Sequence, residues 1–392
     1  MTATSGTPTA HPLSTAEGRQ ALAAAERQAD PDSLAAATAL RARFSPELAA
    51  GALSQVGLRR AARVKLGARA DALLYTRAGL EQASRAAVAA HHATRFAAAG
   101  VGRVVDLGCG IGIDALALLD AGLEVVAVEA DPETASVAQA NLGTRAQVLV
   151  GDAVALAPRL LGPGVAAYAD PARRTGRGRT WRTEDLRPPW PFVSSLLDGS
   201  RVAGVKLGPG SPHRLIPPGV EAEWVSEHGD TVEVGLWSGR GARAGARVAL
   251  VLPDSRLTAD PDAPEVPVGD VGAVLYEPDG AVIRAGAIAT LGPRLGARLL
   301  HPEIAYLTAD GLTATPYATA FEVLQVQPYS EQALRRWVRE HRIGTLEIKK
   351  RGVDVDPAAL RRRLRPKGAE SATIVLTRTR AGAVIVVVRR VG

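Results

Sequence analysis

The sequence predicts an α/β fold, in which a mostly parallel sheet is covered by helices on both faces. One observation is the apolar run 103–107, which ends at a glycine-rich turn. A second is the alternation of strand-like and helix-like segments, joined by short loops, between residues 101 and 240. A third is the pair of apolar runs on either side of Gly229-Asp230, which predicts an antiparallel hairpin that closes the sheet.

The segments before this sheet predict a tail and a helical domain. Residues 1–14 are rich in Thr, Ser, Pro and Ala and are expected to form a disordered tail. Residues 15–98 are rich in alanine with helical spacing, which predicts an N-terminal domain of four or five helices. Asp30 and Ser45 each precede a proline, and we expect both to be helix N-caps.

Residues 99–240 are expected to form the sheet domain. The predicted strands are 103–107, 124–129, 147–150, 166–169, 201–207, 222–228 and 231–238. The predicted helices are 113–121, 132–141 and 189–198. Because ligands of open α/β sheets bind beyond the carboxyl ends of the strands, the residues that follow these strands are the first candidates for a site.

The turn after the first strand carries Gly108, Gly110 and Gly112, which can approach a ligand closely because they lack a Cβ. Glu129 follows the second strand, near the spacing at which an acid meets ribose hydroxyls. The spacing Gly-x-Gly-x-Gly differs from that of dinucleotide-binding enzymes. Asp106 precedes the loop, where a carboxylate disfavours a pyrophosphate. These features favour a cationic ligand without phosphate, such as S-adenosylmethionine.

The loop from Asp106 to Gly112 resembles motif I of class I S-adenosylmethionine-dependent methyltransferases. Glu129 resembles the ribose-binding acid of that family, Gly151-Asp152-Ala153 its adenine-contacting segment, and residues 168–174 its motif IV. The resemblance implies a Rossmann-like class I methyltransferase sheet with S-adenosyl-L-methionine as cofactor. By this resemblance the cofactor-binding residues are Asp106, Gly108, Gly110, Gly112, Glu129, Asp152 and Ala153.

The segment 73–84 has two interpretations. It resembles a segment that folds over the cofactor in several RNA methyltransferases, including trimethylguanosine synthase, which would place Thr76 and Glu81-Gln82 at the methionine end. The alternative is an ordinary helix start with Thr76 as its cap.

Motif IV supplies the candidate catalytic residues Asp170, Pro171 and Arg173. Enzymes that methylate base nitrogens often carry Asp/Asn/Ser-Pro-Pro-aromatic here, and the first side chain accepts a hydrogen bond from the target amine. Ala172 and Arg173 replace the second proline and the aromatic residue. A guanidinium can stack on a base or bind phosphate, although Arg173-Arg174 could instead pair with surface acids.

The rest of the chain predicts two smaller domains. Residues 241–320, with short strands such as 247–252 and 281–284, are expected to form a β-rich connecting domain. Residues 321–392 predict an α+β order of 321–326, 330–340, 345–350, 357–365, 373–379 and 383–388, where the second and fourth segments are helices. This module resembles THUMP-like domains, which accompany RNA-modifying enzymes, and the chain from Thr76 onward resembles actinobacterial methyltransferases with such a domain.

Charge is distributed unevenly along the chain. The net charge is +7, and residues 331–392 alone carry a net +10. This asymmetry favours a polyanionic partner such as RNA, although a GC-rich genome can also impose an arginine bias. The candidate substrate- or RNA-binding residues are Lys206, Lys349, Lys350 and Arg351, with a second arginine cluster at 361–365.

Several classes are excluded by composition. No run approaches the roughly 18 apolar residues of a membrane span, and the start lacks the pattern of a signal peptide, so we expect a cytoplasmic protein. Cys109 is the single cysteine, and the histidines lack metal-ligand spacing, so no metal is expected. The function predicted is methylation of a base nitrogen in RNA. The alternatives are a protein or small-molecule acceptor, with a structural C-terminal domain, and an RNA-binding protein with a vestigial cofactor fold.

Overall fold

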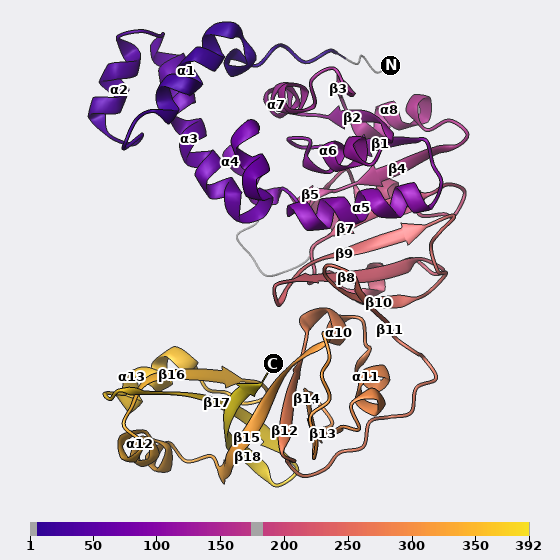
Figure 1. Cartoon of the computed structure of the whole chain (residues 1–392). Helices are drawn as coiled ribbons and strands as arrows, with labels where there is room; N and C mark the ends of the chain where they lie inside the picture. Colours follow the sequence, from indigo (N-terminus) through magenta and orange to yellow (C-terminus); the bar gives the residue numbers. More distant parts are fainter. Residues whose placement is uncertain (1–5, 174–182, 392) are drawn as a thin grey trace. The chain divides into compact units, whose positions relative to one another are not determined.

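The structure is a computed structural model that describes residues 6–173 and 183–391 (Figure 1). The chain divides into two compact units. The first comprises residues 1–222 and 234–245, and the second comprises 223–233 and 246–392. No helix among the described residues is long and apolar enough to cross a membrane.

Helices fill the first part of unit one, as predicted. They are η1 (Pro12–Ser14), α1 (Ala16–Glu26), α2 (Leu34–Arg41), α3 (Pro46–Leu66), η2 (Gly67–Ala72), α4 (Arg77–Gln82) and α5 (Ala86–Ala98). Ser45 caps α3, and Pro46 takes the first helical position as predicted. The prediction for Asp30 is wrong, because α2 begins three residues later and Ser33 is its cap.

The expected tail is folded over residues 6–14. Gly6 forms two backbone hydrogen bonds with Val150 on the edge strand of the sheet, and η1 buries Leu13 in the core. Thr15 then caps α1 by accepting from the Gly18 N–H. The composition did not predict this segment, because it is held by backbone hydrogen bonds, by short-range bonds of His11 and Ser14, and by burial of Pro8 and Leu13.

The first sheet has the order β11-β10-β8-β9-β7-β4-β1-β2-β3. Its strands are β1 (Arg103–Leu107), β2 (Glu124–Glu129), β3 (Gln147–Val150), β4 (Val165–Ala169), β7 (Ala203–Leu207), β8 (Glu221–Glu227), β9 (Asp230–Ser238), β10 (Arg247–Val251) and β11 (Ser255–Thr258). The five strands from β7 to β3 are parallel, and β9 pairs with β7 antiparallel. The two strands of the predicted hairpin, β8 and β9, are neighbours in this sheet. This arrangement confirms the predicted class of sheet.

Helices α6 (Ile113–Asp120), α7 (Pro132–Leu142), α8 (Ala153–Leu160) and α9 (Trp190–Ser195) connect these strands, with a short pair β5 (Ala172–Arg173) and β6 (Leu186–Arg187) and the single turns η3 (Thr183–Asp185) and η4 (His213–Leu215). A single hydrophobic core joins the sheet to the N-terminal helices, since Phe96 of α5 and Leu118 of α6 belong to the same buried cluster. Residues 15–98 therefore belong to the same compact unit as the parallel strands of the sheet.

The second unit contains a seven-stranded sheet in the order β13-β14-β12-β15-β18-β17-β16. Its elements are β12 (Val274–Pro278), α10 (Gly280–Arg284), α11 (Ile288–Arg294), β13 (Arg298–His301), β14 (Ile304–Ala309), β15 (Ala318–Pro328), α12 (Glu331–Glu340), β16 (Ile343–Lys350), α13 (Pro357–Leu364), β17 (Glu370–Thr379) and β18 (Gly382–Val391). The six elements predicted after residue 320 are all present.

The prediction of a separate connecting domain at 241–320 is wrong. Strand β15 pairs with β12 on one side and with β18 on the other, so residues on both sides of position 320 share one sheet. β10 and β11 instead extend the first sheet. The segment 281–284, predicted as a strand, lies in α10, because Asp279 accepts a hydrogen bond from the Ala281 N–H and starts a helix there.

Candidate active site

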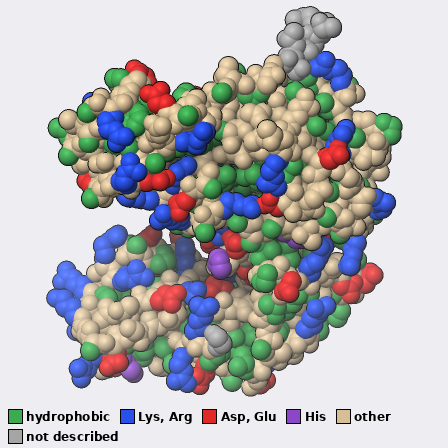
Figure 2. Space-filling view, turned by 45° about the horizontal axis from the view of Figure 1, so that its top comes forward, with side chains coloured by type: hydrophobic (Ala, Val, Ile, Leu, Met, Phe, Trp, Pro, Cys, Tyr) green, Lys and Arg blue, Asp and Glu red, His purple; other side chains and the backbone are tan. Residues whose placement is uncertain are grey.

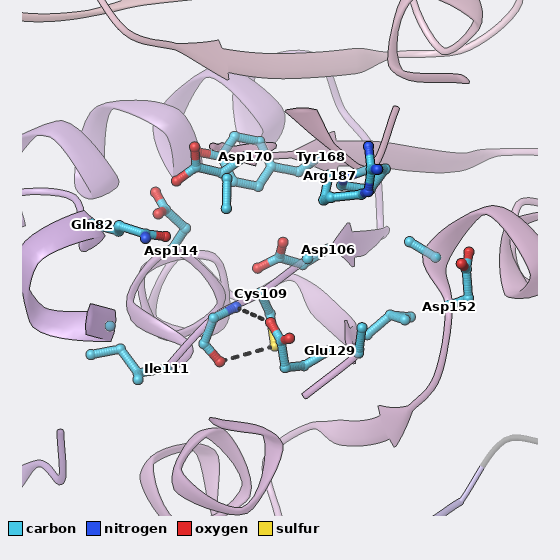
Figure 3. A pocket seen from close by; sticks show the side chains of 18 of the residues that line it. Gln82, Asp106, Cys109, Ile111, Asp114, Glu129, Asp152, Tyr168, Asp170 and Arg187 are labelled. Carbon is cyan, nitrogen blue, oxygen red and sulfur yellow. Dashed lines mark hydrogen bonds between the residues drawn. The ribbon is translucent and has the colours of Figure 1, made fainter. Parts of the chain in front are cut away.

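A cavity of about 720 Å³ lies at the carboxyl ends of the parallel strands of unit one. Five acids line it, namely Asp106, Asp114, Glu129, Asp152 and Asp170. In the view of Figure 3, Asp114 and Asp170 lie at one end and Asp152 at the other, with Asp106 and Glu129 between them. The volume is in the range of small-molecule sites, and the acidic lining disfavours an anionic ligand.

Asp106 comes from the buried strand β1, and 1% of its surface is exposed. Neither carboxylate oxygen has a hydrogen-bond partner among the described residues. Burial raises the pKa of Asp106 well above its usual value, and the nearby Asp114, Asp170 and Glu129 act in the same direction. A buried carboxylate without a partner is costly, so a ligand that offers a cation or a hydrogen-bond donor fits this position.

The glycine loop after β1 approaches this cavity as predicted. Gly108 and Gly110 have φ values of +106° and +55°, which side chains rarely adopt, and both residues line the cavity. Glu129 at the end of β2 accepts hydrogen bonds from the N–H groups of Gly110 at 3.0 Å and Asp131 at 2.9 Å. Burial nevertheless raises the pKa of Glu129. This acid therefore shapes the loop while it faces the cavity (Figure 3).

Gly112 does not line the cavity. It has a φ of +86° and precedes α6, and a Cβ at this position would lie 3.3 Å from Leu142. Its glycine is thus explained by the turn and by close packing against α7.

Asp152 and Ala153 follow β3 and line the far end of the cavity, as predicted. The Asp152 carboxylate caps α8 by accepting from the N–H groups of Val154 at 2.7 Å and Ala155 at 3.2 Å. Helix α8 was not among the predicted helices, although an aspartate at its N-cap position is a sequence signal for a helix start.

Asp170 follows β4 and lines the cavity at the end opposite Asp152. Its Oδ2 lies 2.5 Å from Nζ of Lys206, whose side chain is only 13% exposed. Lys206 therefore holds an acid of the cavity, and does not form part of an exposed RNA-binding surface. Pro171 is buried and does not line the cavity, while the side chain of Arg173 lies outside the described part of the chain.

Helix α4 forms another wall of the cavity, through Gly79, Gln82 and Ala83. Thr76 caps this helix by accepting from the Gly79 N–H at 2.9 Å, and it does not line the cavity. The segment 73–84 thus contributes to the cavity wall, in line with the interpretation that it covers the cofactor. Thr76 itself is a helix cap, in line with the alternative interpretation.

A buried chain of polar side chains, which no sequence motif predicted, reaches the cavity wall through Asp114 and Tyr168. Asp114 of α6 accepts a hydrogen bond from Ser84 at 2.8 Å, and its other oxygen lies 2.8 Å from Nδ1 of His92. The Tyr168 hydroxyl lies 3.2 Å from the same nitrogen. Burial alone would raise the pKa of Asp114, but His92, Lys206 and Ser84 lower it to about 2. The sequence pattern showed His92 only as one of several histidines without metal-ligand spacing.

These features fit a cationic ligand that carries a ribose. Asp106 and the ionised Asp114 favour positive charge, and Glu129 at the end of β2 offers oxygens that accept from ribose hydroxyls. Among the described residues no group of three or more His, Cys, Asp or Glu side chains is placed to hold a metal ion.

Comparisons with known proteins agree with this chemistry. Residues 105–159 match a methyltransferase domain, residues 318–390 match a THUMP domain-like family, and residues 7–62 match a domain of unknown function. Two uncharacterised S-adenosylmethionine-dependent methyltransferases, from Mycobacterium tuberculosis strains CDC 1551 and H37Rv, are each 35% identical over 359 residues. That alignment covers 88% of this chain and 96% of each relative.

The chain belongs to the S-adenosylmethionine-dependent methyltransferases. S-adenosylmethionine is thus its cofactor, and the bound cofactor supplies a methyl group that its sulfonium activates. A solved structure from Porphyromonas gingivalis W83, provisionally assigned as a methyltransferase, shares the fold with a TM-score of 0.77 at 23% identity. It covers 95% of this chain and 99% of its own length.

Two of the predicted RNA-binding cations of the methyltransferase form contacts inside unit two instead. Lys349 pairs with Glu277 at 2.8 Å and lies over the Phe321 ring. Arg351 lies over Tyr306 and donates to the Ala305 carbonyl. These contacts correct both predictions. Lys349, in β16, and Arg351, just after it, are two residues apart, so they share one side of the sheet while Lys350 faces the other. Lys350 is exposed and forms no ion pair with another described residue.

Proposed function

We propose that this methyltransferase modifies a base nitrogen of RNA. The observation that carries the proposal is the carboxylate of Asp170, which faces the cofactor cavity from the carboxyl end of β4. A carboxylate at this position can accept a hydrogen bond from an amine or ring N–H and so orient the nitrogen toward the methyl group. The THUMP domain-like family matched by residues 318–390 supports RNA as the carrier of that nitrogen.

The order of the acids along the cavity supports roles for each of them. We assign Asp170 and Asp114 to the methionine and acceptor end, Asp106 to the positive charge of the cofactor, and Glu129 to the ribose. Asp152, with the backbone of Ala153, would contact the adenine, at the end farthest from Asp170 in Figure 3. Positioning then supplies most of the catalysis, because the methyl group is already activated.

The exposed cations of unit two give this proposal a binding surface. Blue side chains gather over the end of the unit that α12 and α13 form in Figure 2. Five cations at or after the C-terminal ends of these helices are exposed and form no ion pair with another described residue. They are Arg339, Arg342, Arg362, Arg365 and Lys367. We propose that these residues, with Lys350, contact RNA phosphates in place of Lys349 and Arg351.

The test is transfer of a radiolabelled methyl group from S-adenosylmethionine to total RNA from a strain that lacks the gene. Mass spectrometry of the digested nucleosides then identifies the modified base. We expect label in RNA with the parent protein and none with Asp170→Ala, while Asp198→Ala, an exposed loop acid, is the matched control. Label found only in protein or in small molecules would refute the proposal.

A second candidate, methylation of a protein or a small molecule, is favoured by one observation. Lys349, Arg351 and Arg363 are all held within unit two, the last by Glu331 at 2.9 Å, as expected of a domain with a structural role. Absence of RNA binding, together with turnover of a low-molecular-weight acceptor, would establish this candidate.

A further inference from the structure

Two lysine side chains hold the C-terminal end of α4. Nζ of Lys65, on α3, donates to the carbonyls of Leu80 at 2.8 Å, Glu81 at 2.7 Å and Ala83 at 3.1 Å. Nζ of Lys206, on β7, donates to the Gln82 carbonyl at 3.4 Å. The carbonyls of four successive residues, 80–83, therefore accept hydrogen bonds from two ammonium groups that come from different elements.

This arrangement matters because α4 has only six residues, Arg77–Gln82. A helix of this length is not stable by itself, and its last carbonyls have no partner within the helix. Ammonium groups satisfy those carbonyls and interact favourably with the negative end of the helix dipole. The position of α4 thus depends on Lys65 and Lys206, on the Thr76 cap and on the burial of Leu80.

The same helix end is a wall of the cofactor cavity, which Gln82 and Ala83 line. Lys206 also pairs with Asp170 at 2.5 Å. One ammonium group therefore contacts both the wall contributed by α4 and the acid that follows β4. Burial lowers the pKa of Lys65, and repulsion from Lys206 and Arg85 lowers it further, so the two ammoniums are kept close at an electrostatic cost.

We propose that Lys206 is a positioning residue of the methyltransferase, whose ammonium fixes α4 and the Asp170 carboxylate relative to each other while Lys65 holds α4 from the side of α3. The Lys206 ammonium then fixes the positions of both the α4 wall, which retains the cofactor, and the Asp170 carboxylate, which faces the acceptor. The part that concerns the acceptor rests on the proposed function, whereas the part that concerns α4 involves the cofactor site alone.

The experiment uses the full chain and S-adenosylhomocysteine, without RNA, so that its result is independent of the proposed substrate. Amide hydrogen exchange of residues 77–84 and calorimetric binding of S-adenosylhomocysteine are measured for Lys206→Met and Lys65→Met. We expect faster exchange in both variants, and cofactor-product affinity reduced about tenfold or more, the effect of losing a charge-assisted hydrogen bond. Arg60→Met, an exposed cation on α3, is the matched control and should change neither quantity.

A double-mutant cycle tests the link to Asp170. We expect Lys206→Met and Asp170→Asn to be non-additive in their effect on S-adenosylhomocysteine affinity, because both remove the same contact. Lys206→Arg, which keeps the charge, should restore much of the affinity. If Lys206→Met does not fold, Lys206→Gln takes its place in the cycle.

Additive effects in the cycle, or exchange of 77–84 as slow in both lysine variants as in the parent, would overturn the proposal. If the parent protein transfers no label to RNA while the two substitutions are still non-additive, the result counts against the proposed function alone.

Discussion

Asp106 is the residue for which the structure makes the sharpest prediction. Its carboxylate is buried and has no hydrogen-bond partner among the residues that the structure describes, and burial raises its pKa well above the unfolded value. A group with a raised folded-state pKa stabilises the fold most at low pH, and this contribution is lost as the pH rises toward that pKa. Asp106→Asn should therefore make the cofactor-free protein less sensitive to pH while it weakens cofactor binding.

The magnitude follows from linkage. One titrating group changes the free energy of unfolding by at most about 1.4 kcal/mol per pH unit, so Asp106 can remove up to about 2.7 kcal/mol between pH 5 and pH 7. In Asp106→Asn the free energy of unfolding should lack this pH-dependent decrease, because asparagine does not titrate. Affinity for S-adenosylmethionine should fall by roughly 10–100-fold, the equivalent of a charge-assisted contact worth about 1.5–3 kcal/mol. The loss should be smaller for S-adenosylhomocysteine, which lacks the sulfonium charge.

The assay is urea unfolding at pH 5, 6 and 7 without cofactor, followed by calorimetric titration with both ligands at pH 7. Glu124→Gln, an exposed acid on the neighbouring strand β2, is the control and should keep the parent's pH dependence. The reasoning fails if Asp106→Asn follows the same pH dependence of stability as the parent, or if it binds S-adenosylmethionine equally well.

Three further predictions concern the site and the second unit. Asp170→Ala should abolish methyl transfer but reduce S-adenosylhomocysteine affinity less than Glu129→Ala does, as calorimetry and label transfer would reveal. Gly110→Val should prevent binding of S-adenosylmethionine, because its φ of +55° disfavours a β-branched residue, and calorimetry should detect no binding of NAD by the parent. Lys349→Gln should lower the thermal stability of unit two through its broken ion pair, by about 1 kcal/mol, while Lys350→Gln should lower RNA affinity and its salt dependence with unchanged stability.

Much of the sheet could be predicted from the sequence because its signals are local. The strand 103–107, the glycine loop and the acids at the ends of β2 and β3 follow one another along two successive βαβ units, which set their spacing. The cavity confirms that Asp106, Gly108, Gly110 and Glu129 meet at one site.

The contacts that the sequence did not reveal join residues that are distant along the chain. Asp114 lies 22 residues from His92, and Lys206 lies 36 residues from Asp170 and 124 residues from Gln82. No periodicity or spacing encodes such pairs. The predicted domain boundary at residue 320 was wrong for the same reason. Strand β15 pairs not only with β18 but also with β12, which lies far upstream of that boundary.

The charge of the C-terminal segment shows how sequence totals can mislead about a surface. Its net +10 favoured a polyanionic partner, yet Lys349, Arg363 and Arg389 are neutralised by Glu277, Glu331 and Glu322, of which two lie outside the segment. The proposed RNA surface therefore draws on a smaller set of exposed cations, which includes those at the ends of α12 and α13 together with Lys350. Because each neutralised phosphate adds about 0.7–0.9 to the slope of log affinity against log salt, that slope measures how many of these cations contact the RNA. A slope well above what the exposed cations can supply would require basic residues from other parts of the chain.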